Sequence, residues 1–276
     1  MTAAEFFRET RQTFNRWNRK TLRRPMFLFF ALVQPIVWFV LFTATFASIA
    51  QLSGFPTSNY VTWFTAAVVI QTVIASSMQS GLGMVSDLES GFLDKMRVAP
   101  IHRSSILFGK LLSDAFRILI QSFIIIAIAF AYQVTFGTGA AGIVLTLVIA
   151  ALFGIAWAGI SNTLAFATKN AEVTTMASIL TTFPLLFLST AMMPIAFLPS
   201  WVQTVAKYNP ISYVADAFHV LVLTPSWDQL SSPVPNVLGL DISGWGVLGF
   251  AFLTIFVVGA LTLTGASRMF RRTMSA

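Results

Sequence analysis

The side chains that could carry out chemistry in this chain of 276 residues are few and far apart. The two histidines, His102 and His219, are distant in sequence, and cysteine is absent, which excludes a disulfide framework or a thiolate metal site. No G-x-x-x-x-G-K-S/T phosphate loop, H-E-x-x-H or G-x-S-x-G motif occurs. His219 follows Asp216 by one helical turn, so we expect an ion pair or hydrogen bond with a structural role. The sequence indicates a protein that is not an enzyme and binds no cofactor or metal itself.

The composition places these residues in a membrane protein. Hydrophobic residues make up 56% of the chain and charged residues 10%, whereas an ordinary soluble domain is about 25% charged. A helix needs about 20 mainly apolar residues to cross the hydrocarbon core. We therefore expect an all-α polytopic membrane protein whose transmembrane domain covers 26–276. Its six transmembrane helices are predicted at about 27–49, 60–82, 116–135, 142–165, 173–193 and 246–266.

Positive charge is distributed very unevenly across this six-span arrangement. Of the 17 Lys and Arg residues, all but Lys207 fall in segments on one side. The positive-inside rule then places both termini in the cytoplasm. We expect the chain to lie in the inner (plasma) membrane. The net charge of +7 fits this orientation and contact with anionic membrane lipid, so nucleic acid is not expected as a partner.

Ionisable residues inside the spans are nearly absent, although ion-coupled carriers depend on them. The exceptions are Asp114 and Arg117, three residues apart near the start of the third span. We expect them to neutralise one another; a role for Arg117 in substrate entry is the alternative. If the chain moves a substrate, the energy must come from elsewhere.

Two segments on the cytoplasmic side are predicted to be amphipathic helices. Residues 3–22, within an N-terminal unit 1–25, place Phe6, Phe14 and Trp17 at helical spacing among arginines, as in helices that lie in the membrane interface. A disordered basic leader is the alternative. In segment 86–104 a short helix at about 86–98 carries apolar residues on one face, namely Leu88, Phe92, Leu93 and Met96.

The second of these helices mixes acidic and basic residues, which favours docking into a partner over adhesion to lipid. Asp87 and Glu89 would suit its N-terminus, where negative charge is favourable. On the opposite side of the membrane, 194–245 is apolar and rich in proline. We expect an outer lid with two short re-entrant helices, about 199–207 and 210–223, that packs over the ends of the spans, because irregular backbone at membrane depth must be covered by protein.

Polar side chains in two spans could line a substrate path or serve in helix packing, and the sequence leaves both alternatives open. They recur at helical spacing, with two phenylalanines nearby in the fifth span. The residues are Thr72, Ser76 and Gln79 in the second span and Thr174, Ser178, Thr182, Phe183 and Phe187 in the fifth.

The chain resembles the type-2 (ABC-2) exporter permeases, which are membrane subunits of drug, antibiotic-resistance and polysaccharide or lipid exporters. The resemblance covers nearly the whole chain. The matching residues are Gln34 and Pro35 in the first span, Glu89, Gly91, Pro100, Arg103 and Lys110 on the cytoplasmic side, and Pro199, Trp201, Asn209, Pro210 and Asp216 in the outer lid. His219 departs from the pattern, because many relatives carry arginine there.

The resemblance implies a permease subunit that exports an amphipathic drug, lipid or glycolipid. Two copies, or one copy and a paralogue, would form a pore with two separate ATP-binding subunits, which use ATP and Mg. The helix at 86–98 would couple to the ATPase, with Glu89 and Asp94 as polar contacts and Phe92 and Leu93 as an apolar plug. The coupling residues would be Asp87, Glu89, Gly91, Phe92, Leu93, Asp94, Pro100 and Arg103. A membrane receptor or scaffold, or an ion-coupled carrier, is the alternative.

Overall fold

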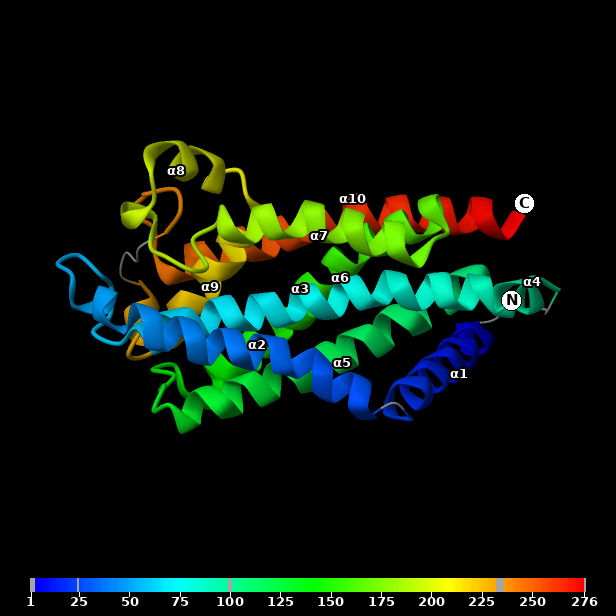
Figure 1. The fold of residues 1–276 in the computed structure, drawn as a ribbon, viewed down its shortest axis with the longest axis horizontal. Coiled ribbons are helices and arrows are strands. Elements are labelled where there is room, and N and C mark those ends of the chain that lie inside the picture. Colours follow the sequence, from blue (N-terminus) through cyan, green and yellow to red (C-terminus); the bar gives the residue numbers. More distant parts are fainter. Residues whose placement is uncertain (1–2, 24, 99–100, 232–235, 276) are drawn as a thin grey trace.

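Figure 1 shows the computed structural model of the chain, an elongated bundle of helices. The structure describes residues 3–23, 25–98, 101–231 and 236–275. Within these ranges it contains helices and no β-strand, which confirms the all-α prediction. The long apolar helices are α2, Pro25–Phe46; α3, Tyr60–Glu89; α5, Arg103–Ala131; α6, Gly139–Thr168; and α10, Gly244–Ser275.

The number of membrane spans differs from the prediction. Five of the described helices are long and apolar enough to cross a membrane, and they correspond to every predicted span except the fifth. That span, 173–193, is represented by α7, Ala171–Phe187, which has 17 residues and is therefore about 25 Å long. Pro184 lies in its last turn, where a residue without an N–H weakens the helix. The six-span arrangement is thus not confirmed, although α7 packs against α3 and α6.

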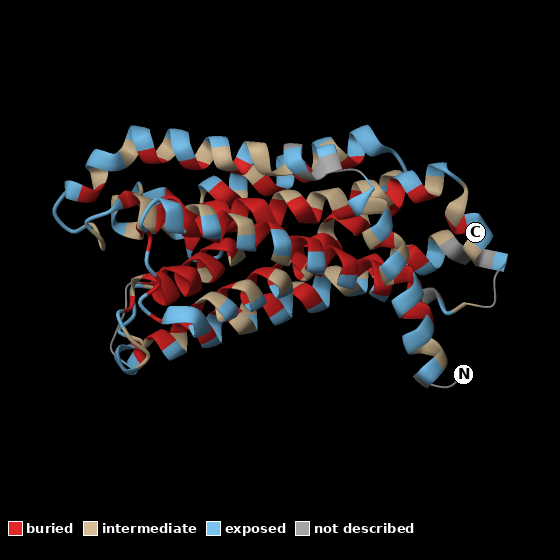
Figure 2. Ribbon diagram, turned by 90° about the horizontal axis from the view of Figure 1, so that it is seen from below, coloured by how far each residue is buried: buried red, intermediate tan, exposed pale blue. Residues whose placement is uncertain are grey.

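Helix α3 forms the centre of the bundle. In its most apolar stretch 78% of the residues are buried, compared with 17% in α2, and Figure 2 shows the buried residues concentrated between the outer helices. Its approach to α6 depends on small residues: a Cβ on Gly81 would overlap the Ser161 carbonyl, and Ser77 Oγ donates to the Gly154 carbonyl at 2.9 Å. Such close contact is typical of helix pairs in membranes.

Helix α1, Ala3–Leu22, coincides with the predicted amphipathic helix, so the alternative of a disordered leader is wrong. It crosses one end of the bundle at an angle (Figure 1) and packs on α5. Aromatic rings join the two helices, with centroids 6.0 Å apart for Phe6 and Phe108 and 6.1 Å apart for Phe14 and Phe116.

The predicted single helix at 86–98 is wrong in extent. Helix α3 continues to Glu89, the chain turns, and a separate helix α4 runs over Phe92–Val98. Gly91, in the turn, has φ of 65°, a left-handed conformation that glycine adopts without steric cost and that commonly ends helices. Asp87 and Glu89 therefore lie at the C-terminal end of α3 and not at a helix N-terminus.

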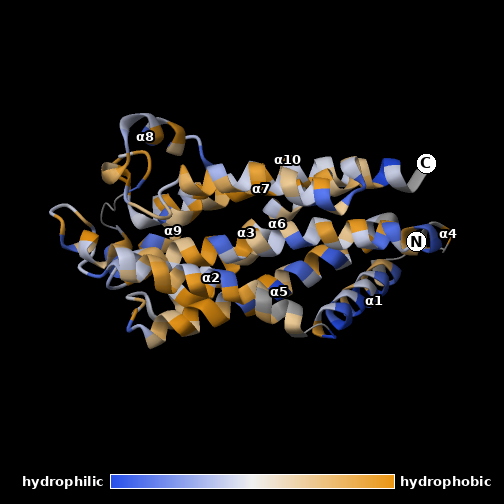
Figure 3. Ribbon diagram, in the orientation of Figure 1, coloured by the Kyte–Doolittle hydropathy of each residue, from blue (hydrophilic) through white to orange (hydrophobic). Residues whose placement is uncertain are grey.

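The two ends of the bundle differ in what they carry. Helix α4, the start of α1 and the end of α10 share one end, hereafter the terminal end, and α8 and α9 lie at the other, the lid end (Figure 1). Helices α8, Ser200–Ala206, and α9, Pro210–Leu223, match the predicted pair in the lid. Helix α9 packs against α3, α6 and α10, so this part of the lid lies against the long helices. Figure 3 shows mainly apolar residues along the helices between the two ends.

Candidate functional site at the junction of α1, α3 and α4

Asp87 is the ionic centre of the terminal end. Its side chain is 3% exposed, and its carboxylate accepts hydrogen bonds from Arg16 at 2.8 and 3.1 Å and from Lys20 at 2.9 Å. The two cations lie one turn apart on the same face of α1. Because a bidentate arginine contact fixes both distance and orientation, Asp87 binds α1 firmly to the end of α3.

Aromatic rings extend this ionic contact to the neighbouring helices. The guanidinium carbon of Arg16 lies 3.4 Å from the centre of the Phe92 ring in α4. The Trp17 ring faces the ammonium groups of Lys20 and Lys110, at 4.7 and 4.4 Å. Cations are attracted to the face of an aromatic ring. Helix α4 is therefore held against α1, and α1 against α5.

The residues predicted to couple to an ATPase divide into buried and exposed groups. Asp87 and Leu93 are buried, and Leu93 packs within the chain's own core, so it offers no surface to a partner. Glu89 and Asp94 are exposed and Phe92 is half-buried. Val98, which the sequence did not single out, is 87% exposed. Gly91 forms the turn, Pro100 lies outside the described residues, and so does the side chain of Arg103.

A second cluster of charges is buried within α5. Lys110 Nζ lies 2.5 Å from Asp114 Oδ2, and Arg117 lies 3.0 Å from Asp114 Oδ1. Their side chains are 1%, 2% and 9% exposed. The predicted pairing of Asp114 with Arg117 is confirmed, and Lys110 joins it. The cluster contains two cations and one anion, and we call it the α5 triad.

Of the predicted polar residues of α3, Ser76 is directed at another helix of the same chain. Ser76 Oγ accepts a hydrogen bond from Arg117 Nε at 2.9 Å, and the Ser76 carbonyl accepts one from Arg117 at 2.7 Å. The Thr72 hydroxyl donates to Val68 one turn earlier. Gln79 is half-buried. Arg117 therefore forms hydrogen bonds with α3 and an ion pair with Asp114, and so joins α5 to α3.

The predicted stripe of α7 also faces inward. Thr174, Ser178 and Thr182 are all buried, and the Thr182 hydroxyl accepts a hydrogen bond from Trp157 Nε1 at 3.3 Å. These contacts favour helix packing. The phenylalanines are more accessible: Phe183 is half-buried and Phe187 is 44% exposed.

The lid residues have clear structural contacts. Asn209 caps α9, accepting from the Ile211 N–H at 3.0 Å, and its amide donates to the carbonyls of Leu185 and Leu188. Pro210 occupies the first turn of α9, where its missing N–H costs nothing. Pro199 precedes α8, and Trp201 is 63% exposed.

The expected contact between Asp216 and His219 is wrong, because each has a more distant partner. Asp216 accepts from the Thr190 hydroxyl at 2.8 Å and the Val237 N–H at 2.6 Å. His219 Nε2 lies 3.2 Å from the Trp63 carbonyl oxygen. The imidazole ring of His219 also stacks on the indole ring of Trp63, with centroids 3.6 Å apart. Both side chains serve to hold the lid on the bundle.

Several residues of the junction were missed by reasoning from sequence. Arg16 and Lys20 were counted only among the basic residues of the N-terminal helix, and Lys110 only among the residues that match the family pattern. Glu9 was also missed: its carboxylate accepts from the His102 N–H at 3.0 Å and the Ser105 hydroxyl at 2.8 Å, at the start of α5. An acidic residue on the buried side of a basic helix was the available signal.

The chain is similar to known proteins over most of its length. Residues 8–223 match the family described as ABC-2 type transporter. The ycf38 proteins of Cyanophora paradoxa and Porphyra purpurea, named as transport permeases, are 32% and 31% identical. The alignments cover 74% and 86% of this chain and 71% and 81% of those relatives.

A bacterial relative carries a more specific name. The daunorubicin resistance ABC transporter permease protein DrrB1 of Streptomyces coeruleorubidus is 24% identical, over 72% of this chain and 69% of the relative. The family match extends from α1, through the α3–α4 junction, to the end of α9. The chain belongs to the ABC-2 type transporter family, whose members are membrane permeases.

Proposed function

We propose that this chain is the membrane subunit of an ATP-driven exporter and that a separate ATPase subunit binds it at α4. Two copies of the chain, or one copy and a paralogue, would each recruit one ATPase subunit. The charge distribution along the sequence supports a cytoplasmic position for the terminal end. ATP and Mg would be bound by the partner.

The single observation that carries this proposal is the construction of α4. It is short and ends in the exposed Val98, and the last residue of α3, just before the turn, is the exposed Glu89. Its inner side is fixed by Leu93 in the core and by Phe92 under Arg16. A helix with an exposed outer face and a rigidly supported inner face can transmit a displacement, whereas a helix lying loosely on lipid cannot.

The proposed cargo is an amphipathic drug, lipid or glycolipid. Support comes from the aromatic side chains of α2 and α7: Trp38 stacks on Phe42 with centroids 4.8 Å apart, and Phe187 lies 5.9 Å from Trp38. Such rings offer a large apolar surface and suit flat or greasy molecules better than polyanions. The daunorubicin resistance named for DrrB1 agrees with this class.

Co-purification tests the ATPase partnership. The tagged chain is solubilised from its native membrane, and bound ATPase is detected by photolabelling with azido-ATP. We expect Glu89→Lys and Val98→Asp to lose the labelled subunit. Glu172→Lys, the same charge reversal at an exposed site in the first turn of α7, serves as the control and should retain it. Equal retention by all three variants would refute the assignment of α4.

A transport assay distinguishes the proposal from an ion-coupled carrier. Efflux of a fluorescent amphipathic dye is measured after ATP depletion while the proton gradient is maintained by respiration. An ATP-driven exporter stops under these conditions. Efflux that continues and then collapses on addition of an uncoupler would show that the energy comes from an ion gradient instead.

A further inference from the structure

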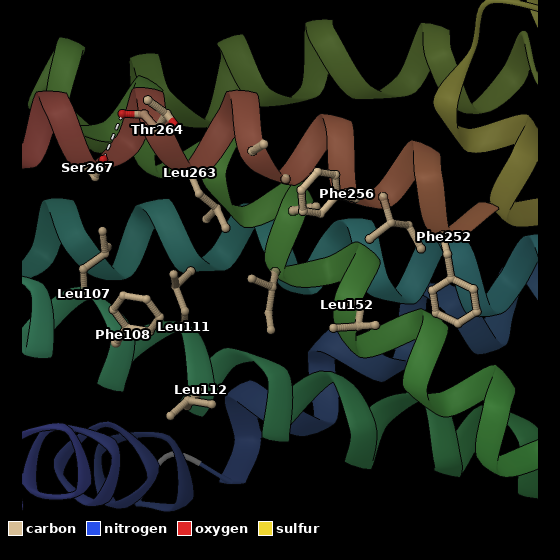
Figure 4. A pocket seen from close by; sticks show the side chains of 15 residues that line it. Leu107, Phe108, Leu111, Leu112, Leu152, Phe252, Phe256, Leu263, Thr264 and Ser267 are labelled. Atoms are coloured by element: carbon tan, nitrogen blue, oxygen red, sulfur yellow. Dashed lines mark hydrogen bonds between the residues drawn. The ribbon is translucent and has the colours of Figure 1, made fainter. Parts of the chain in front are cut away.

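A groove runs along the outside of the bundle, between α5, α6 and α10, and plays no part in the site described above. Its volume is about 800 Å³, and Figure 4 shows apolar side chains from the three helices around it. Apart from Thr264 and Ser267, every lining residue is apolar. Gly259 and Ala156 meet at its floor, where an added Cβ on Gly259 would come within 3.4 Å of the Ala156 Cβ.

The groove is open towards the hydrocarbon and is long enough for an acyl chain. Phe108 and Phe256, on opposite sides of it, are 55% and 74% exposed, so the rim faces the surroundings of the bundle. On α10 the lining extends from Phe252 to Ser267. At 1.5 Å per residue, this stretch of α10 makes the groove about 22 Å long. The groove is therefore longer than the hydrocarbon region of one leaflet, which is roughly 15 Å thick.

One end of the groove is polar and positively charged. Thr264 and Ser267 lie at the terminal end of the lining (Figure 4). Arg271 follows Ser267 by four residues, which continues the same face of α10, and its side chain is exposed. An arginine at this position would lie at headgroup depth, directly beyond an apolar groove.

We propose that the groove binds an anionic phospholipid of the leaflet at the terminal end, with an acyl chain along the floor and the phosphate at Arg271. A basic residue beside an apolar cleft between helices is complementary to such a lipid in both charge and polarity. The cargo and the ATPase are not involved, so the inference stands or falls separately from the proposed function.

A second copy of the chain is the competing occupant, and charge argues against it. Two copies in one membrane share an orientation, so a symmetric contact through this groove would bring their α10 helices together in parallel. Near the end of this helix, Arg268 and Arg271 of one copy would then lie beside those of the other. Like charges in such proximity repel each other, whereas a phosphate neutralises them.

Fluorescence quenching by brominated lipid tests the site directly, because the chain has no cysteine and single labels are unambiguous. Bimane is attached to Ala260→Cys, in the groove, or to the adjacent Leu261→Cys, which is 71% exposed and about 100° away around the helix. The full-length protein is reconstituted in vesicles of phosphatidylcholine and phosphatidylglycerol in which one lipid at a time carries brominated acyl chains.

At each position we compare quenching by brominated phosphatidylglycerol with quenching by brominated phosphatidylcholine. We expect this ratio to be about fivefold higher at position 260 than at position 261, because one arginine near the surface contributes about 1 kcal/mol to anionic lipid binding. Arg271→Ala should abolish this difference, and Arg19→Ala, an exposed arginine on α1, should preserve it. Equal preference at the two positions would overturn the proposal. So would the absence of quenching by either lipid at position 260, which would show that protein covers the groove.

Discussion

The α5 triad allows a sharp test of how buried charge stabilises this bundle. Because it holds two cations and one anion, its members are not equivalent. Removing Asp114 leaves both Lys110 and Arg117 buried without a counter-charge. Removing Lys110 leaves Asp114 paired with Arg117 at 3.0 Å. We therefore expect Asp114→Asn to be severely destabilising and Lys110→Met to be tolerated.

The magnitudes follow from the exposure of the three side chains. Breaking a buried ion pair by removing one partner costs about 3–5 kcal/mol, and Asp114→Asn approaches this because Lys110 is only 1% exposed. Lys110→Met loses the contact with Trp17 at 4.4 Å, an interaction of about 0.5–2 kcal/mol. It also relieves the cost of burying an ammonium group. We expect its net effect to lie within about 1 kcal/mol of zero, as for many replacements of buried ions by apolar residues.

The double variant provides the decisive comparison. In the Asp114→Asn background, Lys110→Met removes an unpaired buried cation, so it should stabilise the protein by about 2 kcal/mol or more. Unfolding free energies are measured by titrating micelles with dodecyl sulfate and following tryptophan fluorescence, to which Trp17 contributes at the triad itself. Additive losses in the double variant, or a Lys110→Met loss as large as that of Asp114→Asn, would refute the reasoning.

Three further substitutions have outcomes that the same titration can measure. Gly91→Ala places a side chain at a residue with φ of 65°, and we expect it to lower the unfolding free energy by about 1 kcal/mol. Gly91→Asn should lower it less. Gly81→Ala should cost more, about 1–3 kcal/mol, because its Cβ would overlap the Ser161 carbonyl; equal losses at the two glycines would contradict this. Asn209→Ala removes the α9 cap and two hydrogen bonds to the end of α7. We expect it to lower the unfolding free energy by about 1–3 kcal/mol and to make proteolysis in the lid faster. Asn209→Ser keeps an oxygen that can cap α9 and loses both bonds to α7, so a loss as large as that of alanine would show that the cap is unimportant.

Local patterns accounted for those parts of the fold that depend on neighbours in sequence. Helix α1 was predicted over its observed length, because Phe6, Phe14 and Trp17 lie at helical spacing. The Asp114–Arg117 pair could be predicted because its members lie one helical turn apart. The lid helices could be predicted from proline and from a composition too polar to span and too apolar to be solvated.

Contacts between distant segments were beyond such reasoning. Asp216 accepts hydrogen bonds from Thr190 and Val237, which are distant in sequence. The prediction that it pairs with His219, one helical turn away, was therefore wrong. The inward orientation of the α7 stripe depends on Trp157 in another helix. The end of α3 depends on the backbone conformation of one glycine, whereas the apolar periodicity continues through the turn and gives no sign of it.

The contacts of the junction connect the proposed ATPase site to the membrane interior without a gap. A displacement of α4 acts on Phe92, whose ring lies under Arg16; Arg16 is bound to Asp87 of α3, and the adjacent Trp17 contacts Lys110 of the triad. Each step joins a different pair of helices, so α4 cannot shift alone while these contacts hold. A rigid connection of this kind transmits a displacement as a whole, because packed interiors resist deformation. Under the proposed function, α1 would be part of the coupling apparatus together with α4, since it supplies both Arg16 and Trp17.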